Sequence, residues 1–173
     1  TPKMMRWGMI PFFWNQSRPP SGSFNARDDK LFESPMWRES FRKKRCLIPA
    51  DGFYEWRKEG KTRIPMRIAL KTRRPFAFAG LWDEWESPNS GNIIQSCTII
   101  TTAPNNAIAN IHTRMPVILS STDYASWLAP TNENPLVLME FIGPYPSDEI
   151  DIYKVSQSVG DARNNIPQLI DPL

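Results

Sequence analysis

The pattern of apolar and polar positions predicts one short helix in the first third of the chain. Ser34-Pro35 has the form of a helix start, with a capping residue before a proline at the first helical position. Met36, Trp37 and Phe41 then recur at helical spacing, and the run 42–45 is entirely basic. Because basic side chains favour the last turn of a helix, we expect a short helix with a basic C-terminus.

Strand character dominates the rest of the chain. Strands are predicted over 46–56 and over 63–70, where apolar side chains alternate with others, and a turn is expected at 58–61. Further strands are predicted at 76–85, 96–103 and 150–155, and short helices at 122–128 and 135–142. No repeat or linker is evident. We therefore predict a single α+β domain over residues 1–173, with a mostly antiparallel, curled, barrel-like sheet and a few short flanking helices.

Composition narrows the class of protein. Of the 173 residues 40% are hydrophobic, and no apolar run suits a membrane span or a secretory signal, so we expect a cytoplasmic protein with no membrane partner. The chain holds two cysteines, Cys46 and Cys97, and one histidine. These numbers are too small for the usual zinc or disulfide frameworks, so we expect no metal and no cofactor.

Positive charge is concentrated in one part of the chain. Residues 38–74 carry 13 basic and 4 acidic side chains, a net charge of +9, whereas 120–173 carry a net charge of −6. Aromatic residues are interleaved with the basic ones, a combination that suits the phosphates and bases of nucleic acids. The alternative is an ordinary solvated face, because a modest basic bias is common in globular proteins.

Two segments place polar side chains where packing alone explains them poorly. Asn25 and Arg27 lie two positions apart and would share one face of an extended segment, where they could hold a phosphate or a sugar oxygen. A turn residue and a surface charge are the alternative. Glu55 lies between Tyr54 and Trp56, and lost hydration there would raise its pKa toward that of a general acid or base. An ion pair with a nearby lysine or arginine is the alternative for Glu55.

The only histidine, His112, lies in a predicted loop two residues before Arg114. In such a loop the imidazole could shuttle protons while the arginine holds an anion. Thr101, at the end of a predicted strand, could supply a hydroxyl to the same place. A packing role for the histidine is the alternative.

Four aromatic residues lie close together at the start of the chain. We expect Trp7 to pack in the core. Phe12, Phe13 and Trp14 follow Pro11, and on a loop they could stack against bases or wedge between them.

Taken together, these segments resemble the SRAP family, the SOS-response-associated peptidases that are also regarded as abasic-site-processing proteins. Motifs in the family's order span most of the chain: Arg6-Trp7-Gly8-Met9-Ile10-Pro11, Asn25-Ala26-Arg27, Ser40-Phe41-Arg42, Arg45-Cys46-Leu47-Ile48-Pro49-Ala50-Asp51-Gly52-Phe53-Tyr54-Glu55-Trp56, Phe78-Ala79-Gly80-Leu81-Trp82, Thr98-Ile99-Ile100-Thr101 and Ile111-His112-Thr113-Arg114-Met115-Pro116. The resemblance implies a DNA-repair protein, expected to be monomeric, that binds single-stranded DNA at an abasic site and forms a covalent crosslink with it.

In such proteins the nucleophile is an N-terminal cysteine exposed by removal of the initiator methionine. Its amine and thiol capture the ring-opened sugar aldehyde as a thiazolidine. By motif match, Asn25 positions the cysteine and the sugar, Glu55 transfers protons, and His112 assists proton transfer and crosslink reversal. The other residues that the resemblance implies at the DNA are Arg27, Thr101 and Arg114.

One part of the family's pattern is missing from this sequence. The family places a segment beginning Met-Cys-Gly-Arg before the Arg-Trp-Gly motif, whereas here five residues precede Arg6. Cys46 and Cys97 lie in predicted strands and carry no free α-amine, so we expect an N-terminally truncated SRAP-like domain that does not form the crosslink. The alternatives are a cysteine-type peptidase, a non-catalytic single-stranded DNA-binding module, and a basic scaffold with no nucleic-acid partner.

Overall fold

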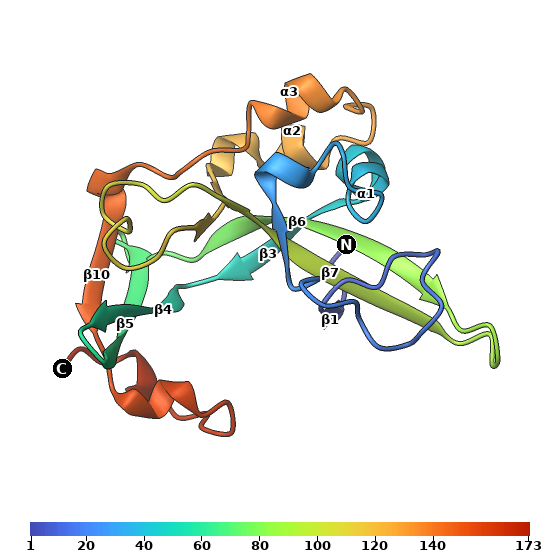
Figure 1. Ribbon diagram of the computed structural model, residues 1–173. Helices are drawn as coiled ribbons and strands as arrows, with labels where there is room; N and C mark the ends of the chain where they lie inside the picture. Colours follow the sequence, from blue (N-terminus) through green and yellow to red (C-terminus); the bar gives the residue numbers. More distant parts are fainter.

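The computed structural model describes residues 1–173 and contains two β-sheets and a group of short helices (Figure 1). The strands are β1 (Arg6–Trp7), β2 (Asn25–Arg27), β3 (Arg45–Ala50), β4 (Phe53–Glu59), β5 (Thr62–Leu70), β6 (Phe76–Glu86), β7 (Ile93–Thr102), β8 (Met115–Pro116), β9 (Ile118–Leu119) and β10 (Ile150–Lys154). The α-helices are α1 (Arg38–Lys43), α2 (Tyr124–Leu128) and α3 (Pro135–Met139). No helix is long and apolar enough to cross a lipid bilayer.

The larger sheet has seven strands and is built around β6 and β7. These two strands are antiparallel to each other, β3 and β9 pair antiparallel with β6, and β8 pairs antiparallel with β7. Only β1 and β2 run parallel to their partner, β7. The smaller sheet has the order β10-β5-β4, all antiparallel, so β4 is a free edge. The α+β class with mostly antiparallel pairing is confirmed, although the two sheets do not close into a barrel.

The two faces of the seven-stranded sheet pack against different layers. Ala79 and Leu81 of β6 share one buried cluster with Phe41 of α1, Trp127 of α2 and Leu138 of α3. Successive side chains of a strand point to opposite faces, so the even-numbered residues of β6 point away from the helices. We call this second face the inner face because it meets the smaller sheet. Figure 1 shows the helices and the smaller sheet in separate places around the larger one.

Packing between the sheets defines the inner face. Phe78 of β6 belongs to a buried cluster with Ile68 of β5 and Ile150 of β10. Ile108, from the loop between β7 and β8, is part of the same cluster. That loop, residues 103–114, is therefore held between the two sheets.

The strand predicted over 46–56 is two strands, β3 and β4, which belong to different sheets. The break falls at Asp51-Gly52. A Cβ atom on Gly52 would lie 2.9 Å from the carbonyl oxygen of Ile68, a close approach that only glycine permits. The break turns the chain out of the larger sheet and carries Glu55 into the smaller one.

The predicted helix starts later than expected. Its first residue is Arg38, because the backbone N–H groups of Trp37 and Arg38 both donate to the carbonyl of Ser34, each at 3.0 Å, and form a turn first. Asn134 does cap α3 as expected, since its side chain accepts from the N–H of Leu136.

Arg45, expected at the end of the first helix, is instead a buried residue of β3. Its guanidinium donates to four backbone carbonyls at the C-terminal ends of two helices. Those of Phe41 (3.1 Å) and Arg42 belong to α1, and those of Trp127 (2.6 Å) and Ala129 (2.7 Å) lie at the end of α2. A helix leaves its last carbonyls without intrahelical partners, so this one cation satisfies the C-terminal ends of both α1 and α2.

Candidate functional site

A row of residues crosses the inner face on four neighbouring strands. The register places Asn25 opposite Ile99, Ile99 opposite Gly80, and Gly80 opposite Cys46. Residues directly opposite each other share a face, and Gly80 shares its face with Phe78, so Asn25 lies on the inner face. Arg27 is opposite Thr101 on the same face. Both Asn25 and Arg27 are exposed, as expected for an extended segment, and the residue between them is fully buried.

Glu55 faces this row from the smaller sheet. It lies two positions after Phe53, whose ring packs on the Phe78 ring with centroids 5.8 Å apart. Glu55 therefore points to the space between the sheets, with 24% of its side chain exposed. Burial raises the pKa of Glu55, although the nearby charge of His112 opposes the shift. No lysine or arginine pairs with this carboxylate; its partner is His112, with Nδ1 and Oε1 separated by 3.8 Å.

The loop 103–114 positions His112. Two contacts anchor the loop. Ile108 is buried between the sheets, and the side-chain amide of Asn105 donates to the carbonyl of Tyr145 at 2.6 Å. Nδ1 of His112 lies 2.9 Å from the carbonyl oxygen and 3.1 Å from the backbone nitrogen of Arg114, and the imidazole remains 46% exposed. The ring is thus oriented by its own loop and open to a ligand, which is not the environment of a core histidine.

Arg114 connects this loop to β7 and to the short 3₁₀ turn, Asp28–Lys30, that follows β2. Its guanidinium donates to Oδ1 of Asp28 at 2.8 Å, to Oγ1 of Thr101 at 3.2 Å, and to the carbonyl of Thr101. Burial disfavours the charged form of Asp28, but hydrogen bonds from Thr102 and Arg114 outweigh it, so the pKa of Asp28 lies below its ordinary value of 3.8. Asp28 is a site residue that sequence reasoning missed; its position directly after the Asn25–Arg27 segment was the available signal.

Both arginines expected to hold phosphates are paired with carboxylates. Arg27 makes two hydrogen bonds to Asp29, at 2.9 and 2.8 Å, and both side chains are about half exposed. Arg114 is only 20% exposed and is shared between Asp28 and Thr101. An incoming phosphate must therefore compete with Asp29 at Arg27, while Arg114 is already occupied in holding the His112 loop.

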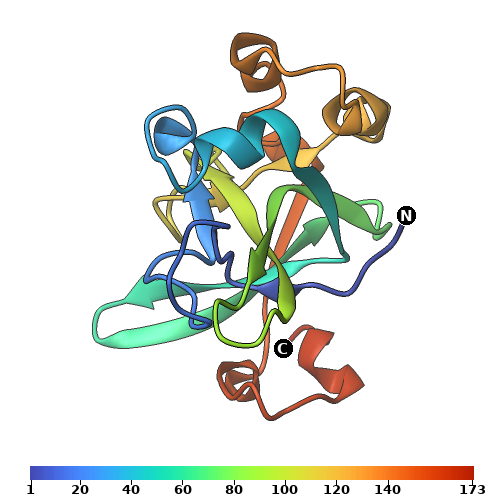
Figure 2. The same cartoon turned by 90° about the vertical axis from the view of Figure 1, so that its right-hand side faces the viewer.

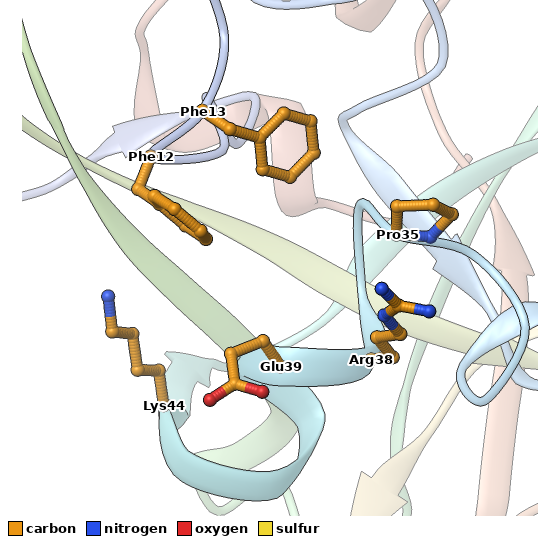
Figure 3. Close-up of a pocket in the computed structure, with 6 residues that line it drawn as sticks. All are labelled: Phe12, Phe13, Pro35, Arg38, Glu39 and Lys44. Atoms are coloured by element: carbon orange, nitrogen blue, oxygen red, sulfur yellow. The ribbon is translucent and has the colours of Figure 1, made fainter.

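The three aromatic residues expected to stack on bases, Phe12, Phe13 and Trp14, lie elsewhere. The carbonyl of Trp14 accepts from Nε1 of Trp85, which points to the helix side of β6. The N–H of Phe12 donates to Asp83 at 2.9 Å, and Asp83 points to the helix side of β6, as Leu81 does. Phe13 is 50% exposed and lines a separate hollow of about 510 Å³ (Figure 3). Its lining residues are Phe12, Phe13, Pro35, Arg38, Glu39 and Lys44. The structure does not bring Phe13 and Trp14 to the face that carries Asn25 and Thr101.

The expectation that Trp7 packs in the core is wrong. Trp7 is 54% exposed because β1 is a two-residue edge strand, and its register opposite Cys97 places the ring on the inner face. The ring packs edge-on against Phe24, with centroids 5.5 Å apart, and Nε1 donates to the Phe24 carbonyl at 2.8 Å. Trp7 is therefore an exposed aromatic side chain on the face that carries the candidate site.

The two thiols are poor nucleophiles. Burial raises the pKa of Cys46 to about 12, with a further contribution from Cys97, and burial raises the pKa of Cys97 as well. Because the thiolate is the reactive form, both thiols are unreactive near neutral pH. This agrees with their placement in strands β3 and β7.

The arrangement suits proton transfer on a ligand held between the sheets. A carboxyl group with a raised pKa faces an exposed imidazole, and proton transfer by such groups requires only that both reach the reacting atoms. An amide, Asn25, and a hydroxyl, Thr101, lie on the facing strands and can orient a polar ligand.

A substitution at Asp28 tests the connection to Arg114. We expect Asp28→Asn to lower the free energy of unfolding at pH 7 by about 1–2 kcal/mol, because a charged hydrogen bond is removed. The lowered pKa means that this stabilisation is present above the ordinary value of 3.8 and is lost as the pH falls through the folded-state value. Urea unfolding of both proteins at several pH values should show the difference shrinking in acid. A difference that stays constant down to pH 2 would contradict this assignment.

Comparison with known proteins identifies the family that this chain resembles. Residues 1–162 match the family described as SOS response associated peptidase (SRAP). The chain is 45% identical over 168 residues to the abasic site processing protein YoqW of Bacillus subtilis, covering 96% of this chain and 75% of that protein. It is 33% identical over 190 residues to the abasic site processing protein HMCES of Xenopus tropicalis, covering 95% of this chain and 55% of that protein.

A solved structure extends the similarity to the fold. A crystal structure of a protein from Bacteroides thetaiotaomicron superimposes with a TM-score of 0.88 at 30% identity, covering 98% of this chain and 75% of that one. This chain belongs to the SRAP family.

Proposed function

We propose that the protein processes abasic sites in single-stranded DNA. The observation that carries the proposal is the Glu55–His112 pair, a half-buried carboxyl group 3.8 Å from an exposed imidazole, held between the two sheets. It occurs in a chain whose relatives YoqW and HMCES are named abasic site processing proteins. An abasic sugar has no base, so its reactive carbon is accessible to groups held between the sheets.

The reaction we propose is covalent capture of the sugar by an N-terminal cysteine that precedes the motifs described here. Opening of the deoxyribose ring gives an aldehyde at C1′. The α-amine attacks C1′, and the carbonyl oxygen leaves as water to give an imine. The thiol sulfur then adds to the same carbon while its proton passes to the nitrogen, so that the net change is loss of one water. An α-amine suits this role because its pKa is low enough for a neutral fraction near pH 7.

The residues of this chain supply the proton transfers. Glu55, whose pKa is raised by burial, gives a proton to the departing oxygen and recovers one from the attacking amine. His112 exchanges protons with the oxygen and nitrogen bonded to the same carbon and assists the reverse reaction. Asn25, on the facing strand, orients the amine and the sugar.

A denaturing gel of DNA with one abasic site tests the proposal. We expect an adduct that survives denaturation with a protein extended to the native, methionine-processed cysteine, and none with the 173-residue chain that begins at Thr1. Replacing Cys46 and Cys97 by serine in the extended protein should leave the adduct unchanged, since both lie in strands, Cys46 half-buried and Cys97 buried. An adduct formed by the 173-residue chain, or none with either protein, would overturn the crosslinking mechanism.

Peptide cleavage is the second candidate, because the family's description includes the word peptidase. The proposed nucleophile and proton-transfer groups would be the same. Turnover of an unrelated peptide by the extended protein, blocked by replacement of the N-terminal cysteine, would favour it over DNA processing.

A further inference from the structure

The hairpin of β4 and β5 carries a cluster of cations that nothing in the protein neutralises. Lys58, Lys61 and Arg63 are all exposed, and none of them forms an ion pair. Figure 2 shows this hairpin, drawn in cyan and green, projecting from the body of the molecule. The one acidic side chain at its end, Glu59, pairs with Arg57 at 2.6 Å.

Two of these cations face each other across the hairpin. Lys58 lies directly opposite Arg63 in the β4–β5 ladder. Like charges in directly opposed positions destabilise a pair of strands, and here no carboxylate relieves the repulsion. An arrangement that is unfavourable in the free protein becomes favourable when an anion binds between the two cations.

Lys58 and Arg63 lie on the outer face of the smaller sheet, and Lys61 lies in the turn between the two strands. Side chains alternate along a strand, so Lys58 points away from the side that carries Glu55, and Trp56 shares the outer face with it. Trp56 is 36% exposed and lies opposite Pro65. An exposed aromatic ring beside unneutralised cations is the combination that binds a nucleic-acid strand through stacking and phosphate contacts.

The cation cluster lies on the same strand as Glu55 of the candidate site. Lys58 follows Glu55 by three residues, which is about 10 Å along a strand. Because β4 is the free edge of its sheet, no other strand pairs with that edge between Glu55 and Lys58. The C-terminal segment contacts the outer face of β4 at Tyr54, whose hydroxyl donates to the carbonyl of Leu169 at 3.4 Å.

We propose that the Lys58–Arg63 pair, with Lys61, binds the phosphates of the DNA strand as it leaves the abasic site around the edge of β4. This inference rests on the proposed function and adds a second surface to it: the inner face holds the lesion, and the hairpin binds the undamaged strand beside it.

The test compares two double variants that each remove one lysine and one arginine. Lys58→Ala/Arg63→Ala changes the hairpin, and Lys71→Ala/Arg74→Ala removes two exposed, unpaired cations from the other end of β5. Binding of an undamaged single-stranded oligonucleotide of about 20 nucleotides is measured over a range of salt concentrations. Each cation that no longer neutralises a phosphate lowers the slope of log K against log salt by about 0.7 for a single strand, so we expect a decrease of about 1.4 for the hairpin variant. Its affinity should fall about tenfold near physiological salt, and the matched control should change little.

A second measurement checks that the hairpin variant is folded. The hairpin variant should unfold at the same temperature as the unchanged protein or higher, because the like-charge pair has been removed.

Three outcomes would overturn the inference. Equal loss of affinity in both variants would assign the effect to net charge alone. Aggregation of the hairpin variant with unchanged DNA affinity would show that the cations protect a free sheet edge instead. Either result leaves the proposed function standing as long as the extended protein still forms an adduct with abasic DNA. Failure of the unchanged protein to bind DNA at all would overturn both proposals.

Discussion

Replacement of Glu55 by glutamine, in the protein that carries the N-terminal cysteine, is expected to slow crosslinking to abasic DNA by about 10²-fold. Glutamine keeps the shape and the hydrogen-bonding capacity of the side chain but cannot gain or lose a proton near neutral pH. The DNA affinity should change little, since only 24% of the Glu55 side chain is exposed and glutamine keeps its size. Single-turnover gel assays at saturating protein measure the rate, and a filter-binding titration measures the affinity.

The pH dependence of the crosslinking rate tests whether proton transfer by Glu55 causes this effect. Because burial raises the pKa of Glu55, its protonated form persists to higher pH than for an ordinary glutamate. If proton donation by Glu55 limits the reaction, the rate falls as the pH rises through that raised pKa, and the Gln variant lacks this descending limb. Glu59→Gln is the matched control, since Glu59 is an exposed residue of the same strand and face. Equal, small effects of the two substitutions would contradict the role assigned to Glu55.

The largest loss of stability is expected from Arg45→Met. The substitution keeps an apolar stem of similar length but leaves four backbone carbonyls without the guanidinium that they share. Buried acceptors left without a donor cost about 1–3 kcal/mol each, partly recovered by water and local shifts. We expect the free energy of unfolding to fall by about 3 kcal/mol or more.

Arg42→Met provides the control for Arg45. Arg42 is exposed on α1 and forms only a long ion pair with Glu133, at 3.8 Å, so its replacement should change the free energy of unfolding by less than about 1 kcal/mol. Urea unfolding followed by circular dichroism measures both variants. A loss for Arg45→Met as small as that for Arg42→Met would show that the shared cap does not stabilise the two helices.

Much of the fold could be predicted from the sequence because its strands have strong local patterns. The apolar and β-branched run of β7 and the long apolar stretch of β6 identified both strands at nearly their observed positions. The Asn134 cap likewise marked the start of α3. These features depend on side chains that are close in sequence, where periodicity and capping carry the information.

The errors concern residues whose role depends on distant partners. Trp7 was expected in the core, but its exposure is set by the pairing of β1 with the edge of β7. Arg45 was predicted at the end of a helix. Only the position of α2 in the fold shows that its guanidinium binds the C-terminal carbonyls of two helices. Asp28 was missed because its partner, Arg114, is 86 positions away.

The candidate site shows the same difference between residues that local patterns identify and positions that depend on distant partners. Motif resemblance identified Asn25, Glu55 and His112, but no local pattern could separate them from Phe13 and Trp14 on the other side of the larger sheet. The separation follows from the alternation of side chains along β6, which assigns Asp83 to one face and Gly80 to the other. Register, which the sequence did not reveal, decides which of the predicted residues lie together.

Because Glu55 and His112 are attached to different sheets, changes in the packing between the sheets affect the site even when they are far from it. Glu55 belongs to β4, and His112 belongs to a loop that begins and ends in the larger sheet and is anchored by Ile108. The separation of the two groups is therefore a property of how the sheets are stacked and not of any single element. Variation at core positions such as Ile108 or Phe78 can therefore tune the chemistry through the separation of the two groups, without any contact to DNA.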